Sequence, residues 1–361
     1  MGSGPSANKV GHQKAISERN AQIFMLNLKT LSLENNFGVS GVMDLGEEHS
    51  FIGDLSAFDA NLDSSTDAIY FGTTKTDVGE DLGGKLFRLR VVPGAGASSH
   101  RWKVDIMFDA KAAIVEGPQL SLDKNGNRWV HMGTGRFMTK SDTKTNKVMH
   151  LYGLKEPRNN QGEFDMDTYS STPRIITLPD LVDVSGARVS ELSGALNNTV
   201  WVSPSLSSDT VESLEQRQVQ YSDASLYTSG WQRKMSMGER IMGKGLILGG
   251  VYSQNTYTPE AKVCSVSGDA KLYALRYTTG TAWYQHIFSK SVSGNSSAND
   301  EVMDVIETGS SPSLSPRVHL GELRNKRKVT IMNTSSNTSM SVNVEQNLKG
   351  IHSKTVSWRE L

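Results

Sequence analysis

The sequence contains a single cysteine, Cys264, and carries no net charge. One cysteine excludes a disulfide within the chain, but an exported protein can also lack disulfides, so the compartment stays open. The 38 basic residues balance the 38 acidic residues, which removes the general attraction to nucleic acid that a basic protein has. We therefore expect no nucleic-acid partner.

Long apolar runs are also missing. No stretch approaches the roughly 18 residues that a membrane-spanning helix needs, so we do not expect an integral membrane protein. No charged and then apolar segment typical of a secretory signal peptide opens the chain. Residues 1–20, which begin Met-Gly-Ser-Gly-Pro-Ser, are expected to be an added leader or a flexible segment, with any natural targeting signal missing.

Motifs of catalytic centres are absent. The eight histidines are scattered and form neither a His-Glu-x-x-His pattern nor a cluster with cysteine. The sequence also has no Gly-x-Ser-x-Gly elbow and no phosphate-binding loop. We therefore expect that the protein is not an enzyme.

What the sequence does contain is a series of short runs rich in Val, Ile, Tyr and Phe, separated by Gly, Asn, Ser and Thr. Such runs are typical of β-strands bounded by turns. The predicted strands are Ile23–Leu28, Ile69–Phe71, Leu86–Val92, Arg128–Met132, Ile175–Leu178, Leu246–Tyr252, Leu272–Tyr277 and Val329–Met332. The Asn125-Gly126 pair predicts a hairpin turn, because Asn and Gly accept positive φ. One short helix is expected over Ser208–Gln220. The fold class is therefore all-β.

A weak internal repeat favours one architecture within that class. A glycine-ended strand is followed by a strand with an aromatic residue between leucines. The pairs are Ile69–Gly72 with Lys85–Leu89, Val130–Gly133 with His150–Leu154, and Leu246–Gly250 with Lys271–Leu275. Recurring strand pairs with long loop insertions predict a β-propeller over residues 21–361, with an irregular β-sandwich as the alternative. Leu272–Trp283 resembles one blade, and Trp283 is interpreted as a core residue on a return strand.

The segment 59–67 has the clearest functional pattern. Oxygen-bearing side chains recur at every second position, at Asp59, Asn61, Asp63, Ser65 and Asp67. Several oxygens from one tight loop are what Ca²⁺ requires, and this spacing resembles an EF-hand loop. Two departures are Ser64 in place of the turn glycine and Tyr70 in place of the final glutamate. The alternative is a polar turn without metal, since Asp, Asn and Ser favour turns by themselves.

Several segments in a fixed order resemble the C-terminal β-propeller domain of the PilY/PilC family of type IV pilus tip-associated proteins. They are the Asp-rich loop, Leu86–Leu89, Ile114–Pro118, Val130–Phe137, Leu151–Leu154, Gly230-Trp231, Gly238–Ile241, Leu272–Gly280 and Val356–Leu361. The resemblance covers roughly residues 50 to 361, and its specificity comes from the joint order of the segments.

The resemblance implies seven modified blades and a calcium site made by Asp59, Asn61, Asp63, Ser65 and Asp67. It implies a role in pilus biogenesis, control of pilus retraction, surface adhesion and twitching motility. The implied partners are minor pilins or the pilus tip complex, and host or surface receptors. The implied location is exported, at the pilus tip, the cell surface or the outer membrane.

Two other functions stay open at the level of sequence. The Leu272–Trp283 segment also resembles the tryptophan-docking repeat of quinoprotein-like dehydrogenases, although it occurs convincingly once. A propeller that binds protein partners without any metal is the other alternative. Partner binding that depends on calcium would distinguish the pilus-tip function from this alternative.

Overall fold

The computed structural model describes most of the chain. The described residues are 1–6, 15–61, 63–77, 80–93, 100–159, 162–164, 173–190, 200–201, 211–219, 228–260, 267–283, 287–288, 301–313, 315–323, 326–335 and 338–344. Among them strands dominate, and neighbouring strands are mainly antiparallel. The all-β prediction is confirmed. The chain divides into two compact units that alternate along the sequence.

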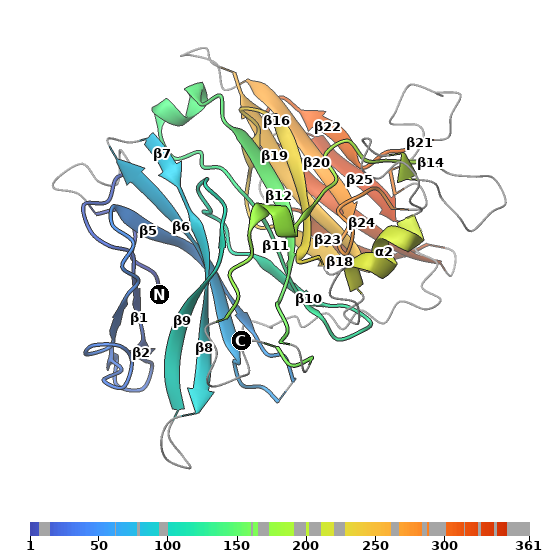
Figure 1. The fold of residues 1–361 in the computed structure, drawn as a ribbon. Helices are drawn as coiled ribbons and strands as arrows, with labels where there is room; N and C mark the ends of the chain where they lie inside the picture. The colour runs from blue at the N-terminus through green and yellow to red at the C-terminus, as the bar shows by residue number, and fades with distance from the viewer. Residues whose placement is uncertain are drawn as a thin grey trace. The chain divides into compact units, whose positions relative to one another are not determined.

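The first unit comprises Met1–Pro118, Met132–Asn146 and Glu156–Leu178. Its main sheet has the strand order β5-β6-β8-β9, with β7 paired to β6 (Figure 1). The strands of this sheet are β5 (Ser50–Phe58), β6 (Ala68–Asp77), β7 (Glu80–Gly83), β8 (Lys85–Pro93) and β9 (His100–Asp109). Two small sheets, β1-β4 and β2-β3, precede it. Their strands are β1 (Gln22–Phe24), β2 (Leu26–Asn27), β3 (Ser32–Leu33) and β4 (Val42–Asp44), and a 3-10 helix η1 spans Lys140–Lys144.

The core of the first unit lies on this sheet. The rings of Phe71 on β6 and Phe87 on β8 stack with centroids 5.7 Å apart, and Ile23, Phe37 and Ile52 are buried in the same cluster. Strand β8 has neighbours on both edges and is buried from Leu86 to Arg90. Because both faces of β8 are buried here, its sequence does not alternate between buried and exposed residues.

The second unit comprises Gln119–His131, Lys147–Lys155 and Pro179–Leu361. Its sheets have the orders β10-β11-β12-β16-β13, β15-β14-β21, β17-β19-β20-β22 with β18 on β19, and β23-β24-β25. The strands are β10 (Gln119–Leu122), β11 (Arg128–Gly133, which runs on into the first unit), β12 (Val148–Lys155), β13 (Val182–Asp183), β14 (Arg188–Ser190), β15 (Val200–Trp201), β16 (Gly230–Met237), β17 (Arg240–Ile241), β18 (Leu246–Leu248), β19 (Val251–Pro259), β20 (Gly268–Arg276), β21 (Glu301–Val302), β22 (Val305–Gly309), β23 (Arg317–Leu323), β24 (Lys326–Ser335) and β25 (Thr338–Val344). The helices are η3 (Leu178–Asp180), which begins at the last residue of the first unit, and α2 (Val211–Val219).

Buried aromatic rings fill part of the second unit. His131 lies among Trp129, Trp231, Tyr252 and Tyr277, with ring centroids between 5.3 and 6.1 Å from its own. The backbone carbonyl of Tyr277 accepts hydrogen bonds from Trp231 Nε1 and pairs with His131 Nε2, both at 2.8 Å. These bonds satisfy Nε1 of Trp231 and Nε2 of His131, as expected for polar atoms of buried rings.

Several sequence predictions are confirmed locally. A hairpin turn joins β10 to β11 as predicted, but its central residues are Lys124 and Asn125, because the N–H of Gly126 donates to the carbonyl of Asp123 at 3.0 Å. Gly126 follows at φ 73°, and the carboxylate of Asp123 accepts the N–H groups of Asn125 and Asn127. Helix α2 lies inside the predicted Ser208–Gln220, whose ends are outside the described residues.

Four local predictions are wrong. Ile23–Leu28 is two short strands, β1 and β2, which belong to different sheets. Leu246–Tyr252 is two strands, β18 and β19, because Gly249 and Gly250 adopt positive φ and reverse the chain. Ile175–Leu178 is not a strand. It has one bridge, from Ile176 to Phe108, before Pro179 enters a 3-10 helix.

The predicted return strand to Trp283 is the fourth error. Residues 281–283 form no strand, and Trp283 instead packs in a core cluster with Val251 and Leu272. The core role of Trp283 is therefore confirmed, and its strand is not. The turn before it, at Gly280, has φ 70° and provides the reversal that the sequence predicted.

Candidate functional site: the Asp-rich loop

The predicted calcium loop is the connection between two neighbouring antiparallel strands. Strand β5 ends at Phe58 and β6 begins at Ala68, and these two residues are opposite each other in the register. Residues 59–67 therefore begin and end at one point of the sheet. Of the loop residues, Leu62 is outside the described part of the chain.

Hydrogen bonds at the base hold the loop shut. The N–H of Asp67 donates to the carbonyl of Phe58 at 2.9 Å, and Asp67 Oδ2 accepts the N–H of Ala60 at 2.7 Å. On the far side, the N–H of Val91 on β8 donates to the carbonyl of Asp67 at 3.3 Å. The base is thus fixed to β5 and β8 together.

Asp59 is buried and organises the interior of the loop. One carboxylate oxygen accepts the N–H of Asp63 at 3.2 Å, and the other accepts the N–H of Ser64 at 2.8 Å. Bonds of this kind are the local side-chain to backbone bonds that Asp favours in turns. They curl the backbone around the Asp59 carboxylate.

The exposed tip contains the remaining predicted ligands. Asn61 Oδ1 accepts the N–H of Asp63 at 2.9 Å, Asn61 Nδ2 donates to Asp63 Oδ2 at 3.1 Å, and Asp63 Oδ1 accepts the N–H of Ser65 at 2.7 Å. An ionised carboxylate has about four acceptor positions, so these bonds leave capacity for a further donor or a cation.

Ser64 occupies the sixth position of the loop, where an EF-hand loop has a glycine in a sharp turn. Its φ is 71°, in the left-handed region that a glycine would occupy without strain. The sharp turn at the sixth position therefore forms although the residue is serine. The cost of that conformation is of the order of 1–2 kcal/mol.

The five predicted ligands have the chemistry of a calcium site, but their side chains are not arranged around a common point. All five predicted ligands are oxygen donors, the type that a hard cation prefers. In the described part of the chain, however, no group of three or more His, Cys, Asp or Glu side chains is positioned to hold a metal. The five residues do lie in one loop, with Asp59 and Asp67 toward its base and Asn61, Asp63 and Ser65 exposed. As they stand, side-chain oxygens of Asp59, Asn61, Asp63 and Asp67 accept hydrogen bonds from N–H groups of the same loop.

A buried polar network behind the loop was not predicted from the sequence. The ring of Tyr70 on β6 contacts Phe58 edge-on, and its hydroxyl donates to Glu156 Oε1 at 2.6 Å. The other oxygen of Glu156 forms an ion pair with Arg88 on β8, and both side chains are buried. The sequence signal that could have indicated it is the presence of two arginines, Arg88 and Arg90, among the apolar residues of β8.

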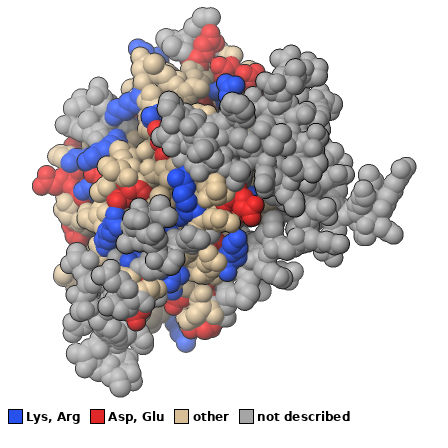
Figure 2. Space-filling model, turned by 45° about the vertical axis from the view of Figure 1, so that its right-hand side comes forward, with Lys and Arg blue, Asp and Glu red and all other residues tan. Residues whose placement is uncertain are grey.

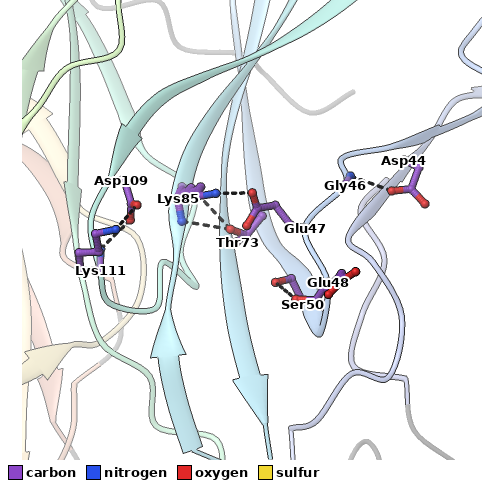
Figure 3. Close-up of polar contacts among 9 residues, drawn as sticks. All are labelled: Asp44, Gly46, Glu47, Glu48, Ser50, Thr73, Lys85, Asp109 and Lys111. Carbon is purple, nitrogen blue, oxygen red and sulfur yellow. Dashed lines mark hydrogen bonds and ion pairs between the residues drawn. The ribbon is translucent and has the colours of Figure 1, made fainter.

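Two other ion pairs of the same unit are less buried than this network: Lys85–Glu47 is half-buried and Lys111–Asp109 is exposed. Figure 3 shows Lys85 reaching Glu47 and Lys111 reaching Asp109, the second at 2.6 Å. More generally, Figure 2 shows Lys and Arg side chains interspersed with Asp and Glu on the described part of one face.

None of the described helices is long and apolar enough to cross a membrane.

Comparison with solved structures shows that the chain has a β-propeller fold. The similarity is to the crystal structure of the Pseudomonas aeruginosa PilY1 C-terminal domain, with a TM-score of 0.55 and 18% sequence identity. It covers 90% of this chain and 66% of that one, so this chain spans just under two thirds of that length. At this identity the likeness shows the fold alone. The number of blades stays a prediction.

Other comparisons add little. An exo-1,5-alpha-L-arabinanase from a bovine ruminal metagenomic library covers 82% of this chain at 9% identity, but its TM-score of 0.28 carries no argument. No family model and no curated protein matches the sequence.

Proposed function

We propose that this chain is a calcium-binding, non-enzymatic β-propeller domain of a type IV pilus tip-associated protein. The observation that carries the proposal is the left-handed turn at Ser64, at the sixth position of an Asp-rich loop. Two further points support it: the fold is similar to that of the PilY1 C-terminal domain, and the loop precedes a glycine-containing strand as in the PilY/PilC pattern.

The loop would bind the cation through Asp59, Asn61, Asp63, Ser65 and Asp67. A bound calcium ion would neutralise three carboxylates that otherwise repel one another within nine residues. Asp59 and Asp67 already occupy fixed positions through their bonds to N–H groups of the loop. The bond from Asn61 Nδ2 to Asp63 would be lost on binding, since both side chains would turn toward the cation. We expect a Kd of about 10⁻⁷ to 10⁻⁴ M.

Calorimetry with Ca²⁺ tests this part directly. Wild type should release or absorb heat with a saturable profile, and Asp63→Ala should not. Asp44→Ala is a matched control, because Asp44 is an exposed carboxylate of the same unit that accepts the N–H of Gly46 at 2.8 Å in a similar turn. Heat that is absent from wild type, or equal in wild type and Asp63→Ala, would refute the calcium site.

Calcium would act here as a structural and regulatory element. A closed loop fixes β5 to β6 and, through Asp67, to β8, so calcium would stiffen one end of this sheet. We propose that this rigid surface binds minor pilins or the pilus tip complex and thereby affects pilus retraction, adhesion and twitching motility. The location would be the exported pilus tip or cell surface.

Pull-down with minor pilins of the source organism, with and without a chelator, tests the pilus role. Capture that requires calcium and is lost in Asp63→Ala supports the proposal. Capture unaffected by the chelator favours a metal-free protein-binding propeller. Turnover of an artificial electron acceptor after addition of pyrroloquinoline quinone would instead support the dehydrogenase alternative.

A further inference from the structure

Exposed leucines gather on the small β2-β3 hairpin of the first unit. The two strands pair with Leu26 opposite Leu33, and residues 28–31 form the turn between them. Leu28 and Leu31 in this turn are 85% and 81% exposed, and Leu26 and Leu33 are also exposed. Figure 1 shows β2 at the outer edge of the first unit. Single exposed apolar residues need no explanation, but a group of them on one hairpin indicates a contact with an apolar partner.

The backbone of this turn is hydrogen-bonded within the hairpin. Asn27 Oδ1 accepts the N–H groups of Lys29 and Thr30 at 3.0 and 3.3 Å. The carbonyl of Asn27 accepts the N–H of Leu31 at 2.8 Å. The hydroxyls of Thr30 and Ser32 are 2.7 Å apart and bond to each other. These three N–H groups and two hydroxyls therefore have partners without water, which is the condition for polar groups to enter an apolar phase at low cost.

Leu31 has an unfavourable backbone conformation. Its φ is 54°, in the left-handed region where a residue with a Cβ is strained and where Gly or Asn is the usual choice. Its exposed side chain gains no burial in the core in return. Packing of the fold therefore does not account for a leucine at this position, and backbone strain of this kind is frequent at functional sites.

The size and composition of the hairpin favour a lipid surface over a protein partner. A stable protein–protein interface uses about 20–30 residues on each side, and its strongest anchors are Trp, Tyr and Arg. Residues 26–33, with the sequence Leu-Asn-Leu-Lys-Thr-Leu-Ser-Leu, include none of these three residue types. A bilayer requires neither a matching shape nor a large area, because each aliphatic side chain that leaves water contributes by itself.

The charge of the hairpin agrees with the same partner. Lys29 is the one charged residue from Leu26 to Leu33, and it is exposed in the turn between the two leucines. A lysine has a long aliphatic stem, so its ammonium group can stay at the level of lipid phosphates while neighbouring side chains lie deeper. The absence of a carboxylate from these eight residues avoids repulsion from those phosphates.

We propose that the β2-β3 hairpin docks the protein on a phospholipid bilayer. Leu28 and Leu31 insert into the apolar boundary of the bilayer, and Lys29 contacts the phosphates of the headgroups. The protein lies on the lipid surface through this hairpin and does not cross it. The inference uses neither the calcium loop nor the pilus assignment, so its test succeeds or fails independently of both.

Cosedimentation of the full chain with phosphatidylcholine vesicles, in the presence of a chelator, tests the hairpin. Wild type should sediment with the vesicles. The double variant Leu28→Ser with Leu31→Asn should bind about a hundredfold more weakly, since each buried leucine contributes about tenfold or more. Asn accepts the left-handed conformation, so the turn is retained. The matched control is Met237→Ser, which removes a 64% exposed apolar side chain of β16 and should bind as wild type.

Insertion and charge are measured separately. Leu28→Trp should show more fluorescence quenching by brominated phosphatidylcholine than wild type, because the added indole lies at the depth of the bromine atoms. Including phosphatidylserine in the vesicles should strengthen wild-type binding by a few fold, and Lys29→Gln should lose this increase but still bind phosphatidylcholine.

Equal vesicle binding by wild type and the double variant, or binding by neither, overturns the proposal. Quenching of Leu28→Trp that does not exceed the quenching of wild type overturns it as well. Sedimentation velocity without lipid tests the other occupant: a wild-type dimer that the double variant cannot form would assign the hairpin to a contact between copies and overturn the lipid proposal. Circular dichroism checks the fold of the double variant. If that variant fails to fold, Leu31→Asn alone should bind vesicles about tenfold more weakly than wild type, and unchanged binding would refute the insertion.

Discussion

The carboxylate of Asp67 accepts the backbone N–H of Ala60 at 2.7 Å, which links the last predicted ligand of the loop to the second residue of the loop. This bond closes the segment before any cation is considered. It gives Asp67 two separable roles, as an acceptor for a partly buried N–H and as a negative charge. Substitutions that retain one role and remove the other distinguish them.

Asp67→Ala should lower the free energy of unfolding by about 1–3 kcal/mol in calcium-free buffer, because the N–H of Ala60 loses its acceptor. Asp67→Asn retains an acceptor oxygen and should cost much less. Urea unfolding with a chelator measures both. Equal losses in the two variants would contradict the assigned hydrogen bond.

The charge of Asp67 matters when calcium is added. A ligand at a hundredfold excess over its Kd stabilises the folded state by about 2.7 kcal/mol. Wild type should gain roughly that amount in urea unfolding at saturating Ca²⁺. Asp67→Asn and Asp63→Ala should gain much less, and the control Asp44→Ala should gain as much as wild type. A full gain in Asp67→Asn would remove this carboxylate from the site.

Ser64→Gly should stabilise the protein modestly. Ser64 has φ 71°, where a residue with a Cβ is strained by about 1–2 kcal/mol. Glycine removes the strain but loses about 0.5–1 kcal/mol through its freer unfolded state, so the net gain is about 0.5 kcal/mol. Ser64→Val should destabilise instead, since a branched side chain fits this conformation worst. Thermal unfolding ranks the three proteins, and a stabilising Ser64→Val would contradict the left-handed turn.

The local features of the fold could be predicted from the sequence because they depend on neighbouring residues. The turn between β10 and β11 and the spacing of oxygens from Asp59 to Asp67 are of this kind. Composition patterns also predicted strands β6, β8, β11, β20 and β24. They failed at Gly249-Gly250, where a run of apolar residues continues through a chain reversal, and at Pro179, which ends a short β-like run.

Long-range features could not be predicted in this way. Residues 1–3 form hydrogen bonds with β1 and β5, and nothing in the sequence Met-Gly-Ser indicates this pairing. The pairing of Arg88 with Glu156 joins residues 68 apart in the chain. The five loop residues were identified together, but their bonds to N–H groups of the loop come from the backbone path and not from the side-chain pattern.

Glu156→Gln should be strongly destabilising. The substitution removes the negative charge opposite Arg88 in a buried pair and weakens the bond from Tyr70. Breaking a buried ion pair from one side typically costs about 3–5 kcal/mol. The matched control is Asp109→Asn, which breaks the exposed pair with Lys111 seen in Figure 3 and should leave the urea midpoint unchanged. If Glu156→Gln changed the free energy of unfolding only slightly, the negative charge of Glu156 would not be needed to stabilise buried Arg88.

Stability should fall with acid because of His131. Burial lowers the pKa of His131 from 6.5 to about 4, against the smaller opposing effect of its backbone hydrogen bonds. The folded state therefore favours neutral His131, and the stability from this preference is present above pH 6.5 and is lost as the pH falls toward 4. Over that window the loss is about 3 kcal/mol, with about 2 kcal/mol gone by pH 5.

His131→Phe isolates this effect from the titration of carboxylates, which both proteins share. At pH 7 the variant should be less stable than wild type, because it loses the bond between His131 Nε2 and the carbonyl of Tyr277. Between pH 7 and pH 5 the wild type should lose about 2 kcal/mol more than the variant, so the gap between them narrows. Urea unfolding at the two pH values measures the gap. A gap that stays constant would mean that His131 is protonated as easily in the folded protein as in the unfolded chain, and that the ring cluster of Trp129, Trp231 and Tyr252 does not exclude its charge.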